Sequence, residues 1–233
     1  MKYNHYYPGN KNIPGLIQKI INQIPVCSKF YEPFAGSAAV TMFLSMLPMG
    51  PVQFFLNDLD PAVTDRFLYP AGCTVTNKPA LDIIQSLISS SAGKDTFVFI
   101  DPPYTFDTRP NSLKLYNFDM SSEDHIQLLK AVRDLECNCM IIHPKTNLYD
   151  QVLQSFRTVQ IKIRYHSKTS IENLYMNYDT PGILQSYAVV GCDCWDRQRI
   201  KRKGERLVQK LLALPEMERN YILSKLSSTF KND

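Results

Sequence analysis

The chain has 233 residues, enough for the core of one full domain, and its 44% hydrophobic and 21% charged residues are typical of a soluble globular protein. No apolar stretch approaches the roughly 18 residues that a membrane-spanning helix needs, and residues 1–7 lack the apolar segment of a secretory signal, so we expect a cytoplasmic protein. The net charge is +4, and the basic part is the last stretch, Trp195 to Asp233, where ten Lys or Arg stand against five Asp or Glu.

Six cysteines, at positions 27, 73, 137, 139, 192 and 194, are expected to be free thiols in a chain without an export signal. They include two Cys-x-Cys pairs, and four thiolates are able to bind zinc. Each pair, however, lies in or beside a strand-like run, and the spacing differs from that of a Cys-x-x-Cys zinc knuckle. We therefore expect no metal site.

The first predicted element is a helix over residues 12–24, where apolar side chains recur at helical spacing and Pro25 closes the run. The turn-rich loop before it carries Tyr7 and Lys11. A lysine at a helix start is disfavoured by the helix dipole, which indicates that Lys11 meets an anion. An ordinary exposed lysine is the alternative.

A strand ending at Glu32 is followed by a turn with one glycine and by a helix over residues 38–44. Strand, glycine turn and helix form a unit in which backbone amides approach a nucleotide-like ligand. The candidate ligand contacts in the turn are Phe34, Ala35, Gly36 and Ser37. Glu32 either orients this loop or the ligand amine, or it caps the backbone that follows.

A second strand over residues 52–56 ends just before Asp58 and Asp60. In dinucleotide folds, an acidic residue about 20 positions after the glycine turn, at the tip of the next strand, binds a ribose diol. Asp58 fits this role, and Asp60 before Pro61 is better explained as a helix cap. The alternative is that both carboxylates only cap.

The centre of the pattern is Asp101-Pro102-Pro103-Tyr104, directly after the apolar and β-branched run 96–100, which predicts a strand buried on both faces. Because proline cannot donate a ladder hydrogen bond, the strand must end there and leave Asp101 at its carboxyl tip. Ligands of open α/β sheets bind at such tips. A carboxylate, a free carbonyl and an aromatic ring suit a planar base with an exocyclic amine; a plain strand-ending turn is the alternative.

The rest of the chain follows from periodicity and from breaker residues. We expect helices over 77–91, 121–135 and 147–156, strands over 137–142, 159–165 and 187–191, and two short helices within 205–226 that separate at Pro215. Two polar stretches lie between them. Residues 105–118 are a candidate lid, and residues 168–181 are a candidate nucleic-acid-facing insertion or a flexible hairpin.

Basic side chains crowd the start of the final stretch: Arg197, Arg199, Lys201, Arg202, Lys203 and Arg206. A phosphate-facing surface requires such a concentration of positive charge. Candidate nucleic-acid contacts are Lys201, Arg202 and Lys203, together with Arg109 and Lys114 of the 105–118 loop. A solvated helix face explains the charge equally well.

Four motifs stand in a characteristic order. They are the loop from Tyr7 to Lys11, Glu-Pro-Phe-Ala-Gly-Ser from Glu32, Asn-Asp-Leu-Asp from Asn57 and Asp-Pro-Pro-Tyr from Asp101. In this order they resemble the Dam-like (D12 class) adenine-specific DNA methyltransferases. The likeness continues through Tyr116, Phe118, Asp124-His125 and the stretch from Tyr175 to Tyr178, and it covers most of the chain up to about Gly191.

The resemblance implies an α/β fold: a Rossmann-like S-adenosylmethionine-dependent methyltransferase sheet with helices on both faces and a small helical C-terminal tail. The catalytic domain would span 1–194 and the basic extension 195–233. The implied activity is methyl transfer from S-adenosylmethionine to N6 of an adenine that is flipped out of double-stranded DNA. Members of the family need no metal.

The resemblance also implies roles for the candidate residues. Contacts to the cofactor would come from Tyr7, Lys11, Glu32, Phe34, Ala35, Gly36, Ser37 and Asp101, and Asp58 would bind the ribose hydroxyls. Asp101 with Pro102 would hold the target amine, Pro103 completes the catalytic turn, and Tyr104 would stack on the flipped base.

Two features depart from the family pattern. Ala38 stands where the turn usually has its second glycine, and only about forty residues separate the second strand from the catalytic one, where relatives carry a target-recognition region. Recognition would then come from 105–118, from 168–181, from the basic tail, or from a separate recognition or restriction partner.

Other functions remain as alternatives. Related turns that begin with Asn serve glutamine methylation and those with Ser often serve cytosine N4, so Asp101 favours adenine. RNA is an alternative substrate, because the turn reads the base and not the sugar. A nucleic-acid-binding protein that keeps the fold without turnover is the alternative from another class, and the intact Asp101 and Tyr104 speak against it.

Overall fold

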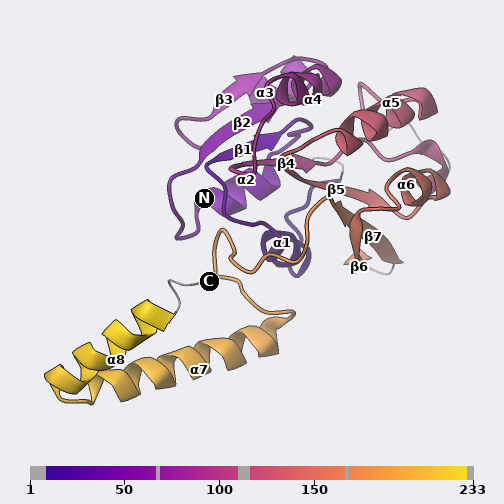
Figure 1. Cartoon of the computed structure of the whole chain (residues 1–233). Coiled ribbons are helices and arrows are strands. Elements are labelled where there is room, and N and C mark those ends of the chain that lie inside the picture. Colours follow the sequence, from indigo (N-terminus) through magenta and orange to yellow (C-terminus); the bar gives the residue numbers. More distant parts are fainter. Residues whose placement is uncertain (1–8, 67–68, 110–115, 166–167, 230–233) are drawn as a thin grey trace. The chain divides into compact units, whose positions relative to one another are not determined.

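The computed structural model of the chain describes residues 9–66, 69–109, 116–165 and 168–229. Its centre is a seven-stranded sheet in the order β3-β2-β1-β4-β5-β7-β6 (Figure 1). The strands are β1 (Lys29–Glu32), β2 (Gln53–Asn57), β3 (Thr74–Thr76), β4 (Thr96–Ile100), β5 (Asn138–Pro144), β6 (Arg157–Tyr165) and β7 (Lys168–Met176). β1 to β5 run parallel to one another, and β7 is antiparallel to both β5 and β6. The predicted Rossmann-like methyltransferase sheet is thereby confirmed.

The described helices are α1 (Leu16–Ile21), α2 (Ala39–Ser45), α3 (Pro61–Arg66), α4 (Ala80–Ser89), α5 (Ser122–Arg133), α6 (Asn147–Val152), α7 (Cys194–Leu212) and α8 (Glu216–Thr229), with a 3-10 turn η1 over Phe106–Thr108. Most lie where the periodicity predicts them, with ends a few residues inside. α5 begins with the predicted capping residues: the Ser121 hydroxyl accepts from the Asp124 amide, and the Asp124 carboxylate accepts from the Ser121 amide.

The central strand β4 explains why helices cover both faces. All five of its residues are buried, as the apolar run predicts. Val98 and Ile100 pack into a core with side chains of α4, α5 and α6. Phe97 points the other way and stacks on Phe30 of β1, at a centroid distance of 5.5 Å, on the face that carries α1 and α2 (Figure 1).

Two predictions for the second half are wrong. Residues 168–176 are not an insertion: they form β7, which pairs with β6 as a hairpin, as the second alternative had it, but Leu174, Tyr175 and Met176 are buried in the sheet. Residues 187–191 form turn and irregular structure rather than a strand, and Tyr187 is exposed. The β6–β7 hairpin already completes the sheet on this side. The short strand β3 was not predicted.

The chain divides into two compact units between Ala188 and Val189. The first contains the sheet and α1 to α6. The second contains α7 and α8, which separate at Pro215 as predicted, but α7 is not short: it begins at Cys194, well before the predicted start at 205, and α8 runs to Thr229. Among the residues described there, no side chain is fully buried. None of the helices that the structure describes is long and apolar enough to cross a membrane.

Candidate active site

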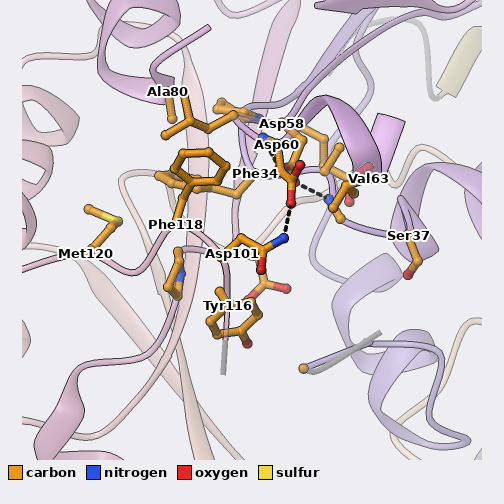
Figure 2. A pocket seen from close by; sticks show the side chains of 18 of the residues that line it. Phe34, Ser37, Asp58, Asp60, Val63, Ala80, Asp101, Tyr116, Phe118 and Met120 are labelled. Carbon is orange, nitrogen blue, oxygen red and sulfur yellow. Dashed lines mark hydrogen bonds between the residues drawn. The ribbon is translucent and has the colours of Figure 1, made fainter. Parts of the chain in front are cut away.

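A hollow of the first unit lies at the carboxyl tips of β1, β2 and β4. It has a volume of about 630 Å³, within the range of small-molecule sites. Its walls come from the turn after β1, the Asp58–Asp60 stretch after β2, the first residues after β4, residues 116–120 and the first turns of α5. Figure 2 shows the carboxylates of Asp58, Asp60 and Asp101 and the side chain of Tyr116 around it.

This cavity brings together the predicted cofactor contacts that the structure describes: Lys11, Glu32, Phe34, Ala35, Gly36, Ser37, Asp58 and Asp101. Pro103 also lines it, whereas Pro102 and Tyr104 do not belong to its walls. Tyr7 lies outside the described residues. Parallel strands end at one edge of a sheet, and for this reason residues far apart in sequence meet here.

Lys11 and Asp101 form a buried ion pair. The Lys11 ammonium lies 2.7 Å from Asp101 Oδ1 and also donates to the carbonyl of Gly9 at 2.8 Å. The Lys11 side chain is only 3% exposed, and its Nζ lies 5.1 Å from the centre of the Tyr104 ring. The expectation that Lys11 meets an anion is confirmed, and the anion is the carboxylate of the catalytic turn.

The surroundings of Asp101 set its charge. Burial raises the pKa of its carboxyl group to about 6, and the neighbouring Lys11 lowers it from the value that burial alone would give. Asp101 is therefore ionised at neutral pH. An ionised carboxylate only accepts hydrogen bonds, and with Lys11 on Oδ1 its second oxygen remains available as an acceptor.

Asp58 holds the glycine turn in place. Its Oδ2 accepts from the Gly36 amide at 2.9 Å, and its Oδ1 accepts from the Asp60 amide at 3.0 Å. A carboxylate offers about four acceptor positions, so two remain for hydroxyl groups of a ligand. Asp58 thus acts as a clamp on this loop and still lines the cavity.

Ala38 occupies a left-handed backbone conformation, with φ of 48° and ψ of 41°, at the start of α2. This is the position where the family pattern has glycine, and the geometry explains why: an L-residue costs about 1–2 kcal/mol in this region. The Ala38 methyl group is fully buried against Ala35 and Leu56. Its packing offsets part of that strain, so the loop keeps its shape without the second glycine.

Asp60 has the predicted capping role and a second one. Its Oδ1 accepts from the Ala62 amide at 2.9 Å, which caps α3. Its Oδ2 accepts from the side-chain amide of Asn117 at 2.7 Å. This bond, drawn in Figure 2, links the segment that follows the candidate lid to the tip of β2. Nothing in the sequence pattern pointed to Asn117.

Glu32 is buried at the tip of β1 and accepts a hydrogen bond from the Thr41 hydroxyl of α2. Burial raises its pKa to about 8; the Thr41 hydrogen bond and the more distant Lys11 lower it, while the Asp101 charge raises it further. Glu32 therefore carries a proton at neutral pH. It ties the strand to the helix through both the hydroxyl and the backbone amide of Thr41, so it accepts from the backbone that follows, which was one of the expected alternatives.

A buried histidine, His143, contacts the Asp101–Tyr104 turn and the residue that follows it. His143 Nε2 accepts from the Thr105 amide at 3.1 Å, and its Nδ1 lies 2.8 Å from the Pro144 carbonyl, so Nδ1 carries the proton. Its ring stacks on Tyr149 at 3.9 Å and meets the Tyr104 ring edge-on at 5.3 Å. Burial lowers the pKa of His143 to about 3, which keeps it neutral and able to accept.

Arg109 does not present its charge to solvent. It is 6% exposed, lies 2.7 Å from Asp119 Oδ1, and donates from Nε to the Tyr104 carbonyl at 2.7 Å. Its guanidinium also lies 4.6 Å from the ring centre of Phe106. This placement contradicts the predicted contact with nucleic-acid phosphate and makes Arg109 a brace behind the catalytic turn. Lys114 lies outside the described residues.

All six cysteines are free, as predicted. Cys139 is buried in β5 and Cys137 is buried just before it, and burial raises the pKa of the Cys137 thiol to about 11. Cys192 and Cys194 are exposed at the start of the second unit. Among the residues with described positions, no cluster of three or more His, Cys, Asp or Glu is arranged to hold a metal ion.

The strand order, with β7 antiparallel, is the Rossmann-like order typical of S-adenosylmethionine-dependent methyltransferases. A family model matches part of the sequence. Residues 85–167 match the model of the family described as D12 class N6 adenine-specific DNA methyltransferase. The recognised resemblance is thereby confirmed over about a third of the chain, from α4 into β6 and across the whole catalytic turn. Lys11 and the glycine turn lie before the matched range.

Solved structures with a similar fold have low identity to this chain. A conserved hypothetical protein of Streptococcus pyogenes is 16% identical, over 72% of this chain and 97% of its own, with a TM-score of 0.43. A type I restriction-modification methyltransferase subunit of Streptococcus thermophilus is 13% identical, over 75% of this chain and 44% of its own, with a TM-score of 0.46. M. capricolum TrmK with S-adenosyl-homocysteine is 8% identical, over 93% and 95%, with a TM-score of 0.44. No match is found among curated proteins.

Proposed function

We propose that the protein transfers a methyl group from S-adenosylmethionine to the N6 amine of an adenine in DNA. The family match across the catalytic turn supports the reaction class. The observation that carries the proposal is the carboxylate of Asp101, which lies on the wall of the strand-tip cavity, is 19% exposed and pairs with Lys11 at 2.7 Å. An ionised acceptor at this place is what a poorly nucleophilic amine requires.

The cavity fits the proposed cofactor in size and in charge. Its volume of about 630 Å³ suits a nucleoside joined to an amino acid. Its lining includes the carboxylates of Asp58, Asp60 and Asp101, which favour a cationic sulfonium, and Asp58 retains acceptor positions for a ribose diol. When bound, the cofactor supplies an electrophilic methyl group whose bonding electron pair returns to sulfur.

Asp101 acts on the target amine. The lone pair of an adenine amine is delocalised into the ring, and an N–H bond donated to Asp101 draws the nitrogen toward the pyramidal geometry that attack requires. In this proposal the Pro102 carbonyl accepts the second N–H bond. Holding amine and methyl group in line contributes up to roughly 7–11 kcal/mol in ideal cases. After transfer the nitrogen loses a proton, and a carboxylate with a pKa of about 6 is able to accept it.

Lys11 and Tyr104 are proposed to prepare the site. Lys11 holds Asp101 in its charged state through the 2.7 Å ion pair, and its ammonium fixes one side of the Tyr104 ring. The adenine has to leave the duplex to reach Asp101, which costs a few kcal/mol, and stacking on Tyr104 offsets part of this cost.

The test is methyl transfer by Asp101→Ala. We expect the variant to lose transfer of a tritiated methyl group to DNA, because the amine loses its acceptor, and to keep its cofactor dissociation constant within about tenfold, or ~1.4 kcal/mol. Transfer is measured by filter binding and cofactor affinity by calorimetry.

The matched control is Asp107→Ala, which removes an exposed carboxylate six positions further along the same loop. It should transfer methyl groups at the wild-type rate. Unimpaired transfer by Asp101→Ala would refute the assigned role. A wild-type protein that binds cofactor and DNA without transferring a methyl group would refute the proposed activity.

A further inference from the structure

Helix α7 of the second unit (Figure 1) carries most of its basic residues on one side of the helical wheel. At about 100° per residue, six side chains fall within a sector of about 100°. These six, named the basic stripe, are Trp195, Arg199, Arg202, Lys203, Arg206 and Lys210. The two acidic side chains of α7, Asp196 and Glu205, both lie outside the sector. The stripe is therefore uniformly cationic with one aromatic residue at its start.

Most of this charge has no internal partner. All six side chains of the basic stripe are exposed. Arg199 is paired with Asp196 at 2.7 Å. No carboxylate of the described chain forms an ion pair with the other four cations, Arg202, Lys203, Arg206 and Lys210. Four exposed positive charges on one helix face repel one another, and an external polyanion would relieve this repulsion.

Trp195 distinguishes between two polyanionic surfaces, nucleic acid and membrane. A membrane-surface helix carries its aromatic residues on the apolar face, away from the basic side chains. Here the apolar face of α7 holds Ile200, Leu207 and Leu211, whereas Trp195 is 76% exposed within the basic sector. It lines a shallow depression with four arginine and lysine residues of the stripe, with Gln198 and Gln209, and with Glu205, whose carboxylate pairs with Lys201 outside the stripe. An aromatic ring among cations is the arrangement that binds bases and phosphates together.

We propose that the basic stripe of α7 binds the phosphate backbone of a nucleic acid without regard to sequence, with Trp195 stacking on an accessible base. This inference rests on the proposed function only in that DNA is the substrate: the stripe supplies affinity and takes no part in the chemistry. The stripe is about 22 Å long at 1.5 Å per residue, a distance over which a DNA duplex carries roughly a dozen phosphates. Phosphates therefore outnumber the cations that meet them.

The stripe revises the residues predicted from charge alone. Arg202 and Lys203 belong to it, but Lys201 projects from a different side of the helix and lies 3.9 Å from Glu205, one turn further on. Arg197 also lies outside the sector. Lys201 and Arg197 are spaced like Arg202 and Arg206, four residues apart on one helix, and so they form a control with the same loss of charge.

The experiment compares two double variants of the full chain, Arg202→Gln with Arg206→Gln and Arg197→Gln with Lys201→Gln. Binding to a fluorescently labelled random-sequence DNA duplex is measured by anisotropy over a range of salt concentrations. Each phosphate contact contributes about −0.9 to the slope of log affinity against log salt. We expect the stripe variant to lower the slope by about 2 and to weaken binding at least tenfold at ~0.1 M salt, and the control variant to bind as the wild type.

The outcomes separate the possibilities. Equal losses in both variants would mean that only net charge matters, and unchanged binding in both would mean that the stripe is not used; either overturns the proposal. Stripe-dependent binding to vesicles of anionic lipid, without an effect on DNA, would overturn it in favour of a membrane. Trp195→Ala should weaken binding to a single-stranded oligonucleotide several-fold. The binding assay needs no methyl transfer, so its result stands apart from that of Asp101→Ala.

Discussion

Two arginine–aspartate pairs of the molecule have the same separation and opposite surroundings. In Arg109–Asp119 the two side chains are 1% and 8% exposed, and in Arg199–Asp196 they are 66% and 23% exposed; the nitrogen–oxygen distance is 2.7 Å in both. The first pair braces the loop behind the catalytic turn, and the second lies on a helix in water. The distance alone therefore does not indicate how much an ion pair contributes to the free energy of unfolding. The loss of one partner costs more where the other charge is left desolvated.

The largest expected effect is that of Asp119→Ala. It leaves the buried guanidinium of Arg109 without its partner, and breaking a buried pair in this way typically costs about 3–5 kcal/mol of stability. The free energy of unfolding, measured by urea denaturation, should fall by that amount. The loop should also loosen around the Tyr104 carbonyl that Arg109 holds.

Asp196→Ala is the matched comparison. It removes the partner of Arg199 at the same distance but in solvent, so the urea midpoint should stay within experimental error of the wild type. A loss in Asp196→Ala as large as that in Asp119→Ala would show that burial does not separate the two pairs. Asp196 also accepts from the Cys192 amide, and a small change at the start of α7 would appear as slight fraying in circular dichroism.

The contrast between buried and exposed partners extends to a neutral group, His143. In His143→Phe the Thr105 amide loses its acceptor in a buried place, which costs about 1–3 kcal/mol of stability. Because this amide directly follows the catalytic turn, we expect kcat for methyl transfer to fall while the cofactor dissociation constant stays the same. Both are measured on the purified variant.

His125→Phe provides the control for His143. His125 is also fully buried, and its Nδ1 lies 2.9 Å from the Tyr149 hydroxyl, but it makes no described hydrogen bond to the catalytic turn. A comparable loss of stability with an unchanged kcat is expected. If both variants lower kcat equally, the effect of His143 is one of general packing and not of positioning.

Much of the site could be predicted because it obeys a rule of the fold. A buried apolar run followed by two prolines places Asp101 at a strand tip, and parallel strands bring the other tips, with Glu32 and Asp58, to the same edge. The helix start at Ser121 was equally readable, because capping is a local interaction between residues three apart. Helix caps and strand ends depend on residues that are adjacent in sequence, and so the sequence alone predicts them.

What could not be predicted depends on partners that are distant in sequence. Residues 168–176 looked polar because Glu172 and Asn173 interrupt the apolar pattern, yet both are buried in β7 beside β5. Arg109 was predicted to be a surface cation, because no residue near it in sequence indicates that it pairs with Asp119. The apolar run 187–191 looked like a strand, but a run of apolar residues forms one only where a sheet edge is open to it.

The smallest expected effect is that of Glu32→Gln, which tests how the burial of a carboxyl group changes the pH dependence of stability. The pKa of Glu32 is about 8 in the folded protein and near 4.5 when the chain unfolds, so between these values only the unfolded state is ionised. The contribution of Glu32 to the free energy of unfolding should therefore fall as pH rises, at about 1 kcal/mol per pH unit. Glutamine keeps an acceptor for the Thr41 hydroxyl and cannot ionise, so the variant should lose this slope.

The window for this measurement is pH 6.5 to 7.5. Other groups also contribute near this window: Asp101 has a folded pKa of about 6, and burial lowers the pKa values of His125 and His143 to about 4 and 3, so the unfolded chain binds more protons at these histidines and their contribution to stability rises with pH. These contributions are shared by the wild type and Glu32→Gln, so the test is the difference between the two slopes. The exposed Asp124 is the opposite case: hydrogen bonds from Ser121 lower its pKa, so its contribution is lost only as pH falls below about 4. Asp124→Asn should therefore keep the wild-type slope between pH 6.5 and 7.5. An equal slope in Glu32→Gln would mean that the Glu32 carboxyl is ionised in the folded protein and that Thr41 and Lys11 outweigh its burial.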